Sequence, residues 1–262
     1  MMNLDLTGKK AIVCGSTQGI GKSIATELSM LGAEITLIAR NEEALRQAAG
    51  SLDTTAGQTH RFLVADFSKP EELRTIFATY MQQHSCDILV NNTGGPPSGP
   101  ITEAGTDAFI SAYQAHLICN HILVQAVLPS MKSSGYGRII NVISTSVKQP
   151  LKGLGVSNTT RAAVAGWAKT LSFEVARFGI TVNNVLPGAT KTQRLESIIS
   201  GKATKTQVKT DEVEQEMLNE IPAGRFGQPE EIAALAAFLA SPAAGYINGQ
   251  SIAVDGGRTM AF

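Results

Sequence analysis

The stretch "KAIVCGSTQGIGKSIATEL", residues 10–28, decides the fold that the sequence predicts. It begins as an apolar run typical of a buried strand, passes through Gly15, Gly19 and Gly21, and continues in a pattern typical of an amphipathic helix. Glycines at such a turn let the chain bend sharply and let backbone N–H groups approach a pyrophosphate at the helix N-terminus. A glycine triplet is weak evidence alone, but at the first strand-to-helix turn of an alternating chain it predicts a dinucleotide site.

Segments of helix length separate this first apolar run from six others. The seven runs lie at residues 10–15, 34–40, 61–66, 87–92, 138–144, 180–188 and 250–257. Strands that are apolar on both faces and alternate with helices indicate a parallel sheet covered on both sides. We therefore predict an α/β fold, in which residues 1–262 form a single doubly wound (Rossmann) domain with a seven-stranded, mostly parallel sheet.

Residues 189–224 interrupt the alternation after the sixth predicted strand with the polar run "SGKATKTQVKTDEVEQEM". A long connection inside a compact domain is usually a functional lid or a disordered segment. This one follows the carboxyl end of a strand, where ligands bind in such sheets, so we interpret it as a substrate lid. Its cations are compatible with a solvated surface and form no arginine cluster for a phosphorylated or acyl-carrier substrate; they are Lys191, Arg194, Lys202, Lys205 and Lys209.

The composition excludes several classes of partner. Lys plus Arg and Asp plus Glu both number 22, so no global field attracts nucleic acid or an anionic membrane. Three scattered cysteines are too few for a disulfide framework, and no apolar run approaches the roughly 20 residues that span a bilayer. The first residues, "MMNLDLTGKK", lack the apolar core of a signal peptide. We expect a cytoplasmic, soluble protein with a small-molecule substrate.

The end of the second predicted strand bears on the choice of cofactor. A carboxylate there accepts hydrogen bonds from the adenosine ribose of NAD, whereas an arginine can pair with the 2′-phosphate of NADP. Residues 37–40 read "LIAR" and contain no Asp or Glu. We therefore expect NADP(H) rather than NAD(H), with Arg40 on the phosphate; the alternative is that Arg40 is only a solvated surface residue.

Several further motifs resemble the short-chain dehydrogenase/reductase family over nearly the whole chain, in particular its 3-oxoacyl-carrier-protein reductase-like branch. They are "GSTQGIG" (15–21), Asp66, "NNTG" (91–94), "GRIINVIS" (137–144), "VNNVLPGATKT" (182–192), "GRFGQPEEIAALAAFLAS" (224–241) and "INGQSIAVDGG" (247–257). The resemblance implies that Gly15, Thr17, Gln18 and Ile20 line the pyrophosphate, Asp66 and Phe67 the adenine, Asn92 and Gly94 the inner ribose, and Pro187, Gly188 and Thr192 the nicotinamide.

The family's catalytic set is a serine, a tyrosine, a lysine four residues later and an asparagine, and only the serine is present here. Ser144 matches the serine, whereas Ser157 stands at the tyrosine position and Arg161 at the lysine position. His116 stands at the asparagine position. The helix after Ser157 matches the family's pattern without a gap, so a shift in register does not explain these differences. The resemblance therefore implies a divergent active site.

Each replacement has more than one interpretation. Ser157 is too short and too weakly acidic to replace a phenol, so it either anchors a proton-donating water or caps its helix. Arg161 keeps a positive charge that can bond ribose hydroxyls but does not give up a proton. His116, with an unperturbed pKa near 6.5, is either a proton carrier beside Ser144 or a hydrogen-bonded histidine in a crowded helix.

A few other residues could take part in catalysis, metal binding or the pocket wall. Tyr113, Tyr246 and Lys148 are further candidates for the missing acid. Cys119 shares a helical face with His116, but His121 is turned away, so we expect no metal. The glycine- and proline-rich stretch "GGPPSG", residues 94–99, is either one wall of the pocket or a rigid loop without ligand contact.

The sequence thus favours an NADP(H)-dependent oxidoreductase that transfers hydride to or from a carbonyl or alcohol with an atypical proton relay. Loss of a general acid typically costs 10²- to 10⁴-fold in rate, which leaves a measurable reaction. The alternatives are a catalytically impaired cofactor-binding sensor or scaffold, or an elimination or isomerisation in the same pocket. The resemblance also implies a homodimer or homotetramer.

Overall fold

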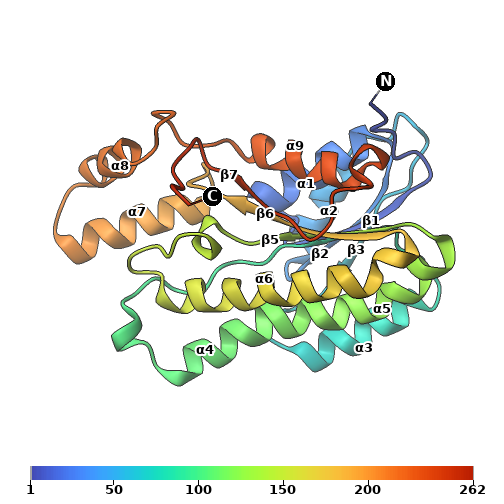
Figure 1. Cartoon of the computed structure of the whole chain (residues 1–262), viewed down its shortest axis with the longest axis horizontal. Helices are drawn as coiled ribbons and strands as arrows, with labels where there is room; N and C mark the ends of the chain where they lie inside the picture. Colours follow the sequence, from blue (N-terminus) through green and yellow to red (C-terminus); the bar gives the residue numbers. More distant parts are fainter. Residues whose placement is uncertain (1, 262) are drawn as a thin grey trace.

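The computed structural model describes residues 2–261, and its core is one seven-stranded sheet (Figure 1). The strands are β1 (Lys10–Cys14), β2 (Glu34–Ala39), β3 (Arg61–Val64), β4 (Ile88–Asn91), β5 (Gly137–Val142), β6 (Ile180–Pro187) and β7 (Ser251–Val254). Their order is β3-β2-β1-β4-β5-β6-β7, and every neighbouring pair is parallel. The predicted doubly wound fold is therefore confirmed, and the sheet is parallel throughout rather than only in most strands.

Within residues 2–261, nine α-helices connect the strands. They are α1 (Gly19–Met30), α2 (Glu42–Gly50), α3 (Pro70–Met81), α4 (Thr106–Tyr113), α5 (Cys119–Ser134), α6 (Gly155–Val175), α7 (Gln193–Thr206), α8 (Thr210–Asn219) and α9 (Pro229–Ala240). Short 3₁₀ turns lie at Ile101–Glu103, Thr145–Val147, Ala176–Phe178 and Pro242–Ala244. Figure 1 shows α1, α2 and α9 over one face of the sheet and α3 to α6 over the other. No helix in the described residues is both long and apolar enough to cross a membrane.

The two faces of the sheet bury separate apolar clusters because successive strand residues point to opposite sides. Val13, Val90 and Ile140 pack with α1 and α9, whereas Ile12 and Leu89 pack with α3 and α5. Successive strands are added toward one side of the sheet from β1 to β3 and toward the other side from β4 to β7, so β1 and β4 are neighbours although two strands separate them in sequence. In such sheets the crevice beyond the carboxyl ends at this switch point is where ligands bind.

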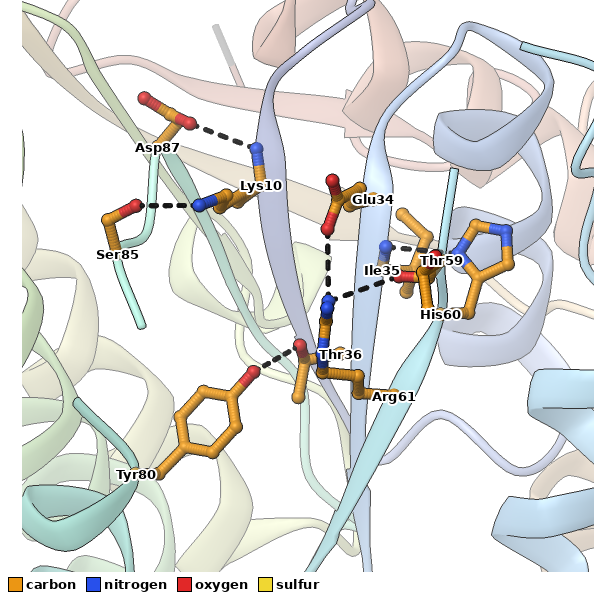
Figure 2. A network of polar contacts seen from close by, with 10 residues as sticks. All are labelled: Lys10, Glu34, Ile35, Thr36, Thr59, His60, Arg61, Tyr80, Ser85 and Asp87. Atoms are coloured by element: carbon orange, nitrogen blue, oxygen red, sulfur yellow. Dashed lines mark hydrogen bonds and ion pairs between the residues drawn. The ribbon is translucent and has the colours of Figure 1, made fainter. Parts of the chain in front are cut away.

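The opposite edge, at the amino ends of β1 to β3, is closed by polar contacts (Figure 2). The contacts join Lys10 N to Asp87 Oδ2 (2.9 Å), Lys10 Nζ to Ser85 Oγ (3.3 Å), Arg61 Nη1 to Glu34 Oε2 (3.0 Å), Ile35 N to His60 Nδ1 (3.1 Å) and Thr36 Oγ1 to Tyr80 OH (2.7 Å). These side chains are hydrogen-bond partners of one another, so they help to hold the strands in register at this end of the sheet. The crevice for ligands lies at the other end, beyond the carboxyl ends of the strands.

Residues 189–224, the segment interpreted as a lid, are mostly helical. Within them, α7 and α8 project beyond the end of the sheet (Figure 1) and enclose a small apolar cluster of their own. The cluster consists of Leu195, Ile199, Ala203, Val213, Ile221 and Phe226. Lys202 Nζ also pairs with Glu216 Oε2 at 2.7 Å across the two helices. The segment is thus a packed helical pair beside the crevice.

An asparagine ladder crosses the sheet just before the strands reach the crevice. Asn91 Nδ2 donates to Asn141 Oδ1 at 2.9 Å, and Asn141 Nδ2 donates to Asn184 Oδ1 at 2.9 Å. All three side chains are buried. Because a buried amide without a partner costs free energy, the ladder favours one register for β4, β5 and β6. It therefore aligns the strand ends from which the crevice residues extend.

Replacing the middle asparagine tests this alignment. We expect Asn141→Ala to lower the free energy of unfolding by about 2–4 kcal/mol, because it leaves both neighbouring amides short of a partner. Urea denaturation measures the loss, and Asn219→Ala, at an exposed position, is the control expected to change it by less than about 0.5 kcal/mol. Equal effects of the two substitutions would show that the ladder does not stabilise the sheet.

Candidate active site

A cleft of about 1990 Å³ opens beyond the carboxyl ends of the strands. The β1–α1 turn, the segments after β2 to β6, the start of α6 and the helices α7 and α8 line it. Every residue expected to contact the cofactor is on its wall: Gly15, Thr17, Gln18, Gly19, Ile20, Gly21, Arg40, Asp66, Phe67, Asn92, Gly94, Arg161, Pro187, Gly188 and Thr192. The fold thus brings together residues that the sequence separates by more than half its length.

The glycine turn between β1 and α1 is a cradle that only glycine can form. A Cβ at Gly15, where φ is +58°, would lie 2.6 Å from Asn92 O, and one at Gly21 would lie 2.7 Å from Asn92 Nδ2. That amide donates to Cys14 O and Gly15 O, each at 3.2 Å. Gln18, the N-cap of α1, makes no side-chain cap, so the first N–H groups of the helix remain available. The turn fits a dinucleotide pyrophosphate.

The adenosine end of the cleft carries Arg40 and Asp66. Arg40 follows β2 directly and is exposed, and no carboxylate lies at the end of that strand. Asp66 follows β3, and Ser68 N donates to its Oδ1 at 2.9 Å. This hydrogen bond, with a smaller contribution from the charge of Arg40, lowers the pKa of Asp66. Asp66 is therefore ionised at neutral pH, and Arg40 is a cation on the same part of the cleft wall.

The opposite end of the cleft is formed where β6 meets α7. Gly188 passes so close to the segment after β7 that a Cβ there would lie 2.6 Å from Asp255 Cβ. Thr192 is the N-cap of α7, and its Oγ1 accepts from Leu195 N at 3.4 Å. The helix therefore starts at the cleft wall, which orients the next residue but one, Arg194, toward the loop after β4.

Ser144, Ser157 and Arg161 line the same cleft. Arg161 is only 9% exposed; its Nε donates to Ser157 Oγ and its Nη1 to Val142 O, both at 3.3 Å. Burial, with a contribution from the charge of Arg194, lowers the pKa of Arg161 to about 10. The guanidinium remains protonated at neutral pH.

The interpretation of Ser157 as a helix cap is wrong. Helix α6 begins at Gly155 with Leu154 as N-cap, so Ser157 already lies inside the first turn. The next residue, Asn158, is not a cap either, since it donates through Nδ2 to Leu151 O at 2.8 Å. Since Ser157 Oγ accepts from Arg161, its own O–H remains available to a group in the cleft.

His116 does not reach the cleft. It lies in a single π-helical turn (Gln114–Ile118), is buried, and its Nδ1 is 2.6 Å from Thr93 Oγ1. Burial and the nearby charges of Arg161 and Arg194 lower the pKa of His116 to about 3. His116 is hydrogen-bonded to Thr93, which lines the cleft, but its own ring is not on the cleft wall and is neutral near pH 7. The geometry favours the alternative of a buried, hydrogen-bonded histidine, and the proton carrier stays a prediction.

The other acid candidates are also outside the cleft lining. Tyr113, Tyr246 and Lys148 are all absent from its wall, and Tyr246 is fully exposed on another surface. Cys119 Sγ donates to Phe67 O at 3.3 Å, and His121 Nδ1 accepts from Trp167 Nε1 at 3.4 Å. Within residues 2–261, no group of three potential metal ligands gathers.

Sequence reasoning missed the role of Arg194, which it counted among the solvated cations of the long connection. Its Nη2 donates to Pro96 O at 2.6 Å, which joins α7 to the glycine- and proline-rich loop. That loop is a wall of the cleft, since Gly94, Gly95, Ser98 and Gly99 line it. The only sequence signal was the position of Arg194 two residues after Thr192.

Comparisons with known proteins agree with this geometry. Residues 15–259 match the family model described as enoyl-(acyl carrier protein) reductase. A 3-oxoacyl-(acyl-carrier-protein) reductase of Haemophilus influenzae is 35% identical over 96% of this chain and 98% of its own. The 7alpha-hydroxysteroid dehydrogenase of Escherichia coli K12 is 32% identical over 97% of this chain and 96% of its own.

A solved structure extends the similarity to three dimensions. The L-sorbose reductase of Gluconobacter frateurii, solved with NADPH and L-sorbose, superposes with a TM-score of 0.92 at 31% identity, with all of both chains covered. The fold described above is thus shared with this solved structure over the whole chain. The chain belongs to the short-chain dehydrogenase/reductase family of NAD(P)-dependent oxidoreductases, in its 3-oxoacyl-carrier-protein reductase-like branch.

Proposed function

We propose that this protein is an NADP(H)-dependent oxidoreductase that transfers hydride to or from a carbonyl or alcohol substrate by an atypical proton relay. The observation that carries the proposal is the convergence of the glycine cradle, Ser144 and Arg161 on one cleft. When bound, the nicotinamide supplies or accepts the hydride. The chain's own residues orient the substrate and handle the proton.

In this proposal Ser144 polarises the substrate oxygen and Ser157 takes part in the proton path. Ser144 Oγ accepts from Ser146 N at 3.1 Å, which leaves its O–H to donate to a carbonyl. Ser157 is held by Arg161 and keeps a free O–H at the cleft, so it can order a water that delivers the proton. Arg161 supplies a fixed positive charge but not the proton, since its pKa is about 10. His116 is outside this path.

The cofactor preference and the role of the helical pair belong to the same proposal. Arg40 supports NADP(H), as does the NADPH bound to the L-sorbose reductase. The helices α7 and α8 are proposed as the substrate lid, which the joining of Arg194 to Pro96 supports. A homodimer or homotetramer and a cytoplasmic location complete the proposal; three free, buried cysteines are compatible with that location.

A second function is favoured by one observation. No Tyr, His or Cys side chain is among the described residues that line the cleft, so no ordinary near-neutral acid is present there. A cofactor-binding sensor or scaffold without catalysis fits that absence. It differs from the oxidoreductase in a measurable way, because it binds NADPH but does not oxidise it.

Turnover of NADPH distinguishes the two proposed functions. We expect calorimetry to show NADPH binding and a carbonyl panel to show slow loss of NADPH absorbance. The joint change Ser157→Tyr and Arg161→Lys supplies a phenol with a cationic neighbour and should raise the rate by about 10²- to 10⁴-fold. Ser144→Ala is the control and should lower the rate in both backgrounds. Binding without turnover in the original chain would support the sensor, and no binding would refute both functions.

The preference for NADPH over NADH can be tested at Arg40. We expect Arg40→Ala to weaken NADPH binding by about 10- to 100-fold, the cost of losing a charge-assisted contact, with little change for NADH. Calorimetric titration of both cofactors measures the difference. Arg46→Ala removes an exposed arginine that lies on α2 outside the cleft lining, and it should leave both affinities unchanged. A similar loss for NADH and NADPH would place Arg40 away from the 2′-phosphate.

The pH dependence of stability tests whether His116 is a buried neutral group. Its pKa is about 3 in the folded protein and near 6.5 when unfolded, so the unfolded chain binds the extra proton between those values. Stability should therefore fall as the pH drops below about 6.5, by up to about 1.4 kcal/mol per pH unit from this group. In His116→Asn this part of the dependence should vanish, which urea denaturation from pH 7 to pH 4 can measure. Parallel curves for both proteins would contradict the buried neutral state.

A further inference from the structure

Two arginines from different helices meet beside Gly95. A Cβ at Gly95 would lie 3.5 Å from Arg161 Nη2 and 3.4 Å from Arg194 Nη2. Arg161 comes from α6 and Arg194 from the first turn of α7, so the two groups approach the loop after β4 from separate walls of the cleft. Their terminal nitrogens therefore border one common space.

Neither guanidinium has an anionic partner in the described chain. Arg161 donates only to Ser157 Oγ and Val142 O, and Arg194 only to Pro96 O. All three acceptors are neutral. Arg161 Nη2 and Arg194 Nε and Nη1 have no acceptor among the described residues, although each guanidinium carries five N–H donors.

Two other cations of the cleft do have carboxylate partners. Lys202 is paired with Glu216, and Arg258 is paired with Glu220. The one other titratable side chain affected by the arginines is His116, which is neutral at physiological pH. Burial, and after it the charge of Arg194, lowers the pKa of Arg161, so the two cations repel one another. An anion placed between them would remove that repulsion and fill the unused donors.

The common space lies in the cleft that also contains the reaction groups. Arg161 contacts Ser157 directly, and its backbone acceptor Val142 O lies two residues before Ser144. An anion held by the two arginines would therefore be bound by Arg161, which also hydrogen-bonds Ser157 of the proposed proton path. A small substrate can place an anionic end there and present its carbonyl to Ser144.

We propose that Arg161 and Arg194 bind an oxyanion of the substrate, a carboxylate or a phosphate, and that the substrate is thus a small anionic carbonyl or alcohol compound. The hydride transfer in this statement rests on the proposed function, whereas the anion site itself does not. A planar guanidinium fork matches both oxyanions in a way that a lysine ammonium does not. The pair therefore gives a chemical reason for arginine, rather than lysine, at position 161.

The test measures anion binding to the full chain without cofactor. Calorimetry and thermal denaturation are carried out with succinate, with inorganic phosphate, and with succinamide as the neutral analogue, all at constant ionic strength. We expect saturable binding of succinate, phosphate or both, with a rise in melting temperature, and no response to succinamide. The tighter of the two anions distinguishes a carboxylate from a phosphate substrate.

Two variants and a matched control assign the binding to this pair. Arg194→Gln removes an exposed side chain and should weaken the anion by about 10- to 100-fold. Arg161→Lys keeps the buried charge, so the protein should fold, but it loses the fork and should also weaken binding. Lys205→Gln removes one positive charge from the same helix and the same cleft, and it should leave the affinity unchanged. Equal losses for Lys205→Gln and Arg194→Gln, or no binding to the original chain, would overturn the proposal.

A repeat with saturating NADP⁺ separates a substrate site from a cofactor contact. We expect the anion to bind at similar affinity beside the cofactor; competition would show that the arginines bind cofactor phosphates and would refute a substrate subsite. Anion binding without any NADPH oxidation would leave the site intact and refute the oxidoreductase. A third outcome is that the protein reduces neutral carbonyls, that Arg194→Gln does not change this rate, and that no anion binds. This outcome would refute only the anion site.

Discussion

The close contact between Asn92 and the first glycine turn is the constraint on which the site depends. Asn92 Nδ2 bonds Cys14 O and Gly15 O at 3.2 Å, and this approach is possible only because positions 15 and 21 have no Cβ. The contact fixes the end of β4 against the start of α1. The loop that follows β4 therefore extends from a fixed position, and this loop includes Gly95, beside which the two arginines meet. The cofactor cradle and the proposed anion site are therefore parts of one rigid arrangement.

The sequence predicted well those features that are set by local pattern. The seven strands and the glycine turn follow from apolar runs and from backbone conformation, which neighbouring residues largely determine. The helices in 189–224 also had a local signal, because Leu195, Ile199 and Ala203 recur at helical spacing, but the polar residues around them obscured it.

The features that were wrong or missed depend on contacts between distant segments. His116 is buried next to Thr93, and its pKa is lowered first by that burial and then by the charges of Arg161 and Arg194, which are far from it in sequence. Ser157 resembles a cap locally, yet α6 starts at Gly155 and turns the hydroxyl toward Arg161. The meeting of Arg161 with Arg194 has no sequence pattern, because α6 and α7 approach each other only across the loop after β4.

In the proposed relay, Ser157 and Arg161 act as one electrostatic unit rather than as two separate losses. A phenol donates a proton to the oxygen that forms on hydride transfer, and a lysine makes that phenol more acidic. Here Ser157 is short, and the longer Arg161 occupies the space beside it with its Nε on the serine oxygen. Two uncompensated guanidinium groups in a partly buried cleft stabilise negative charge on a bound ligand more strongly than they would in water. In the proposed site the anionic end of the substrate takes up that positive charge, so the proton for the reacting oxygen still has to come from a water ordered by Ser157, which Arg161 holds in place.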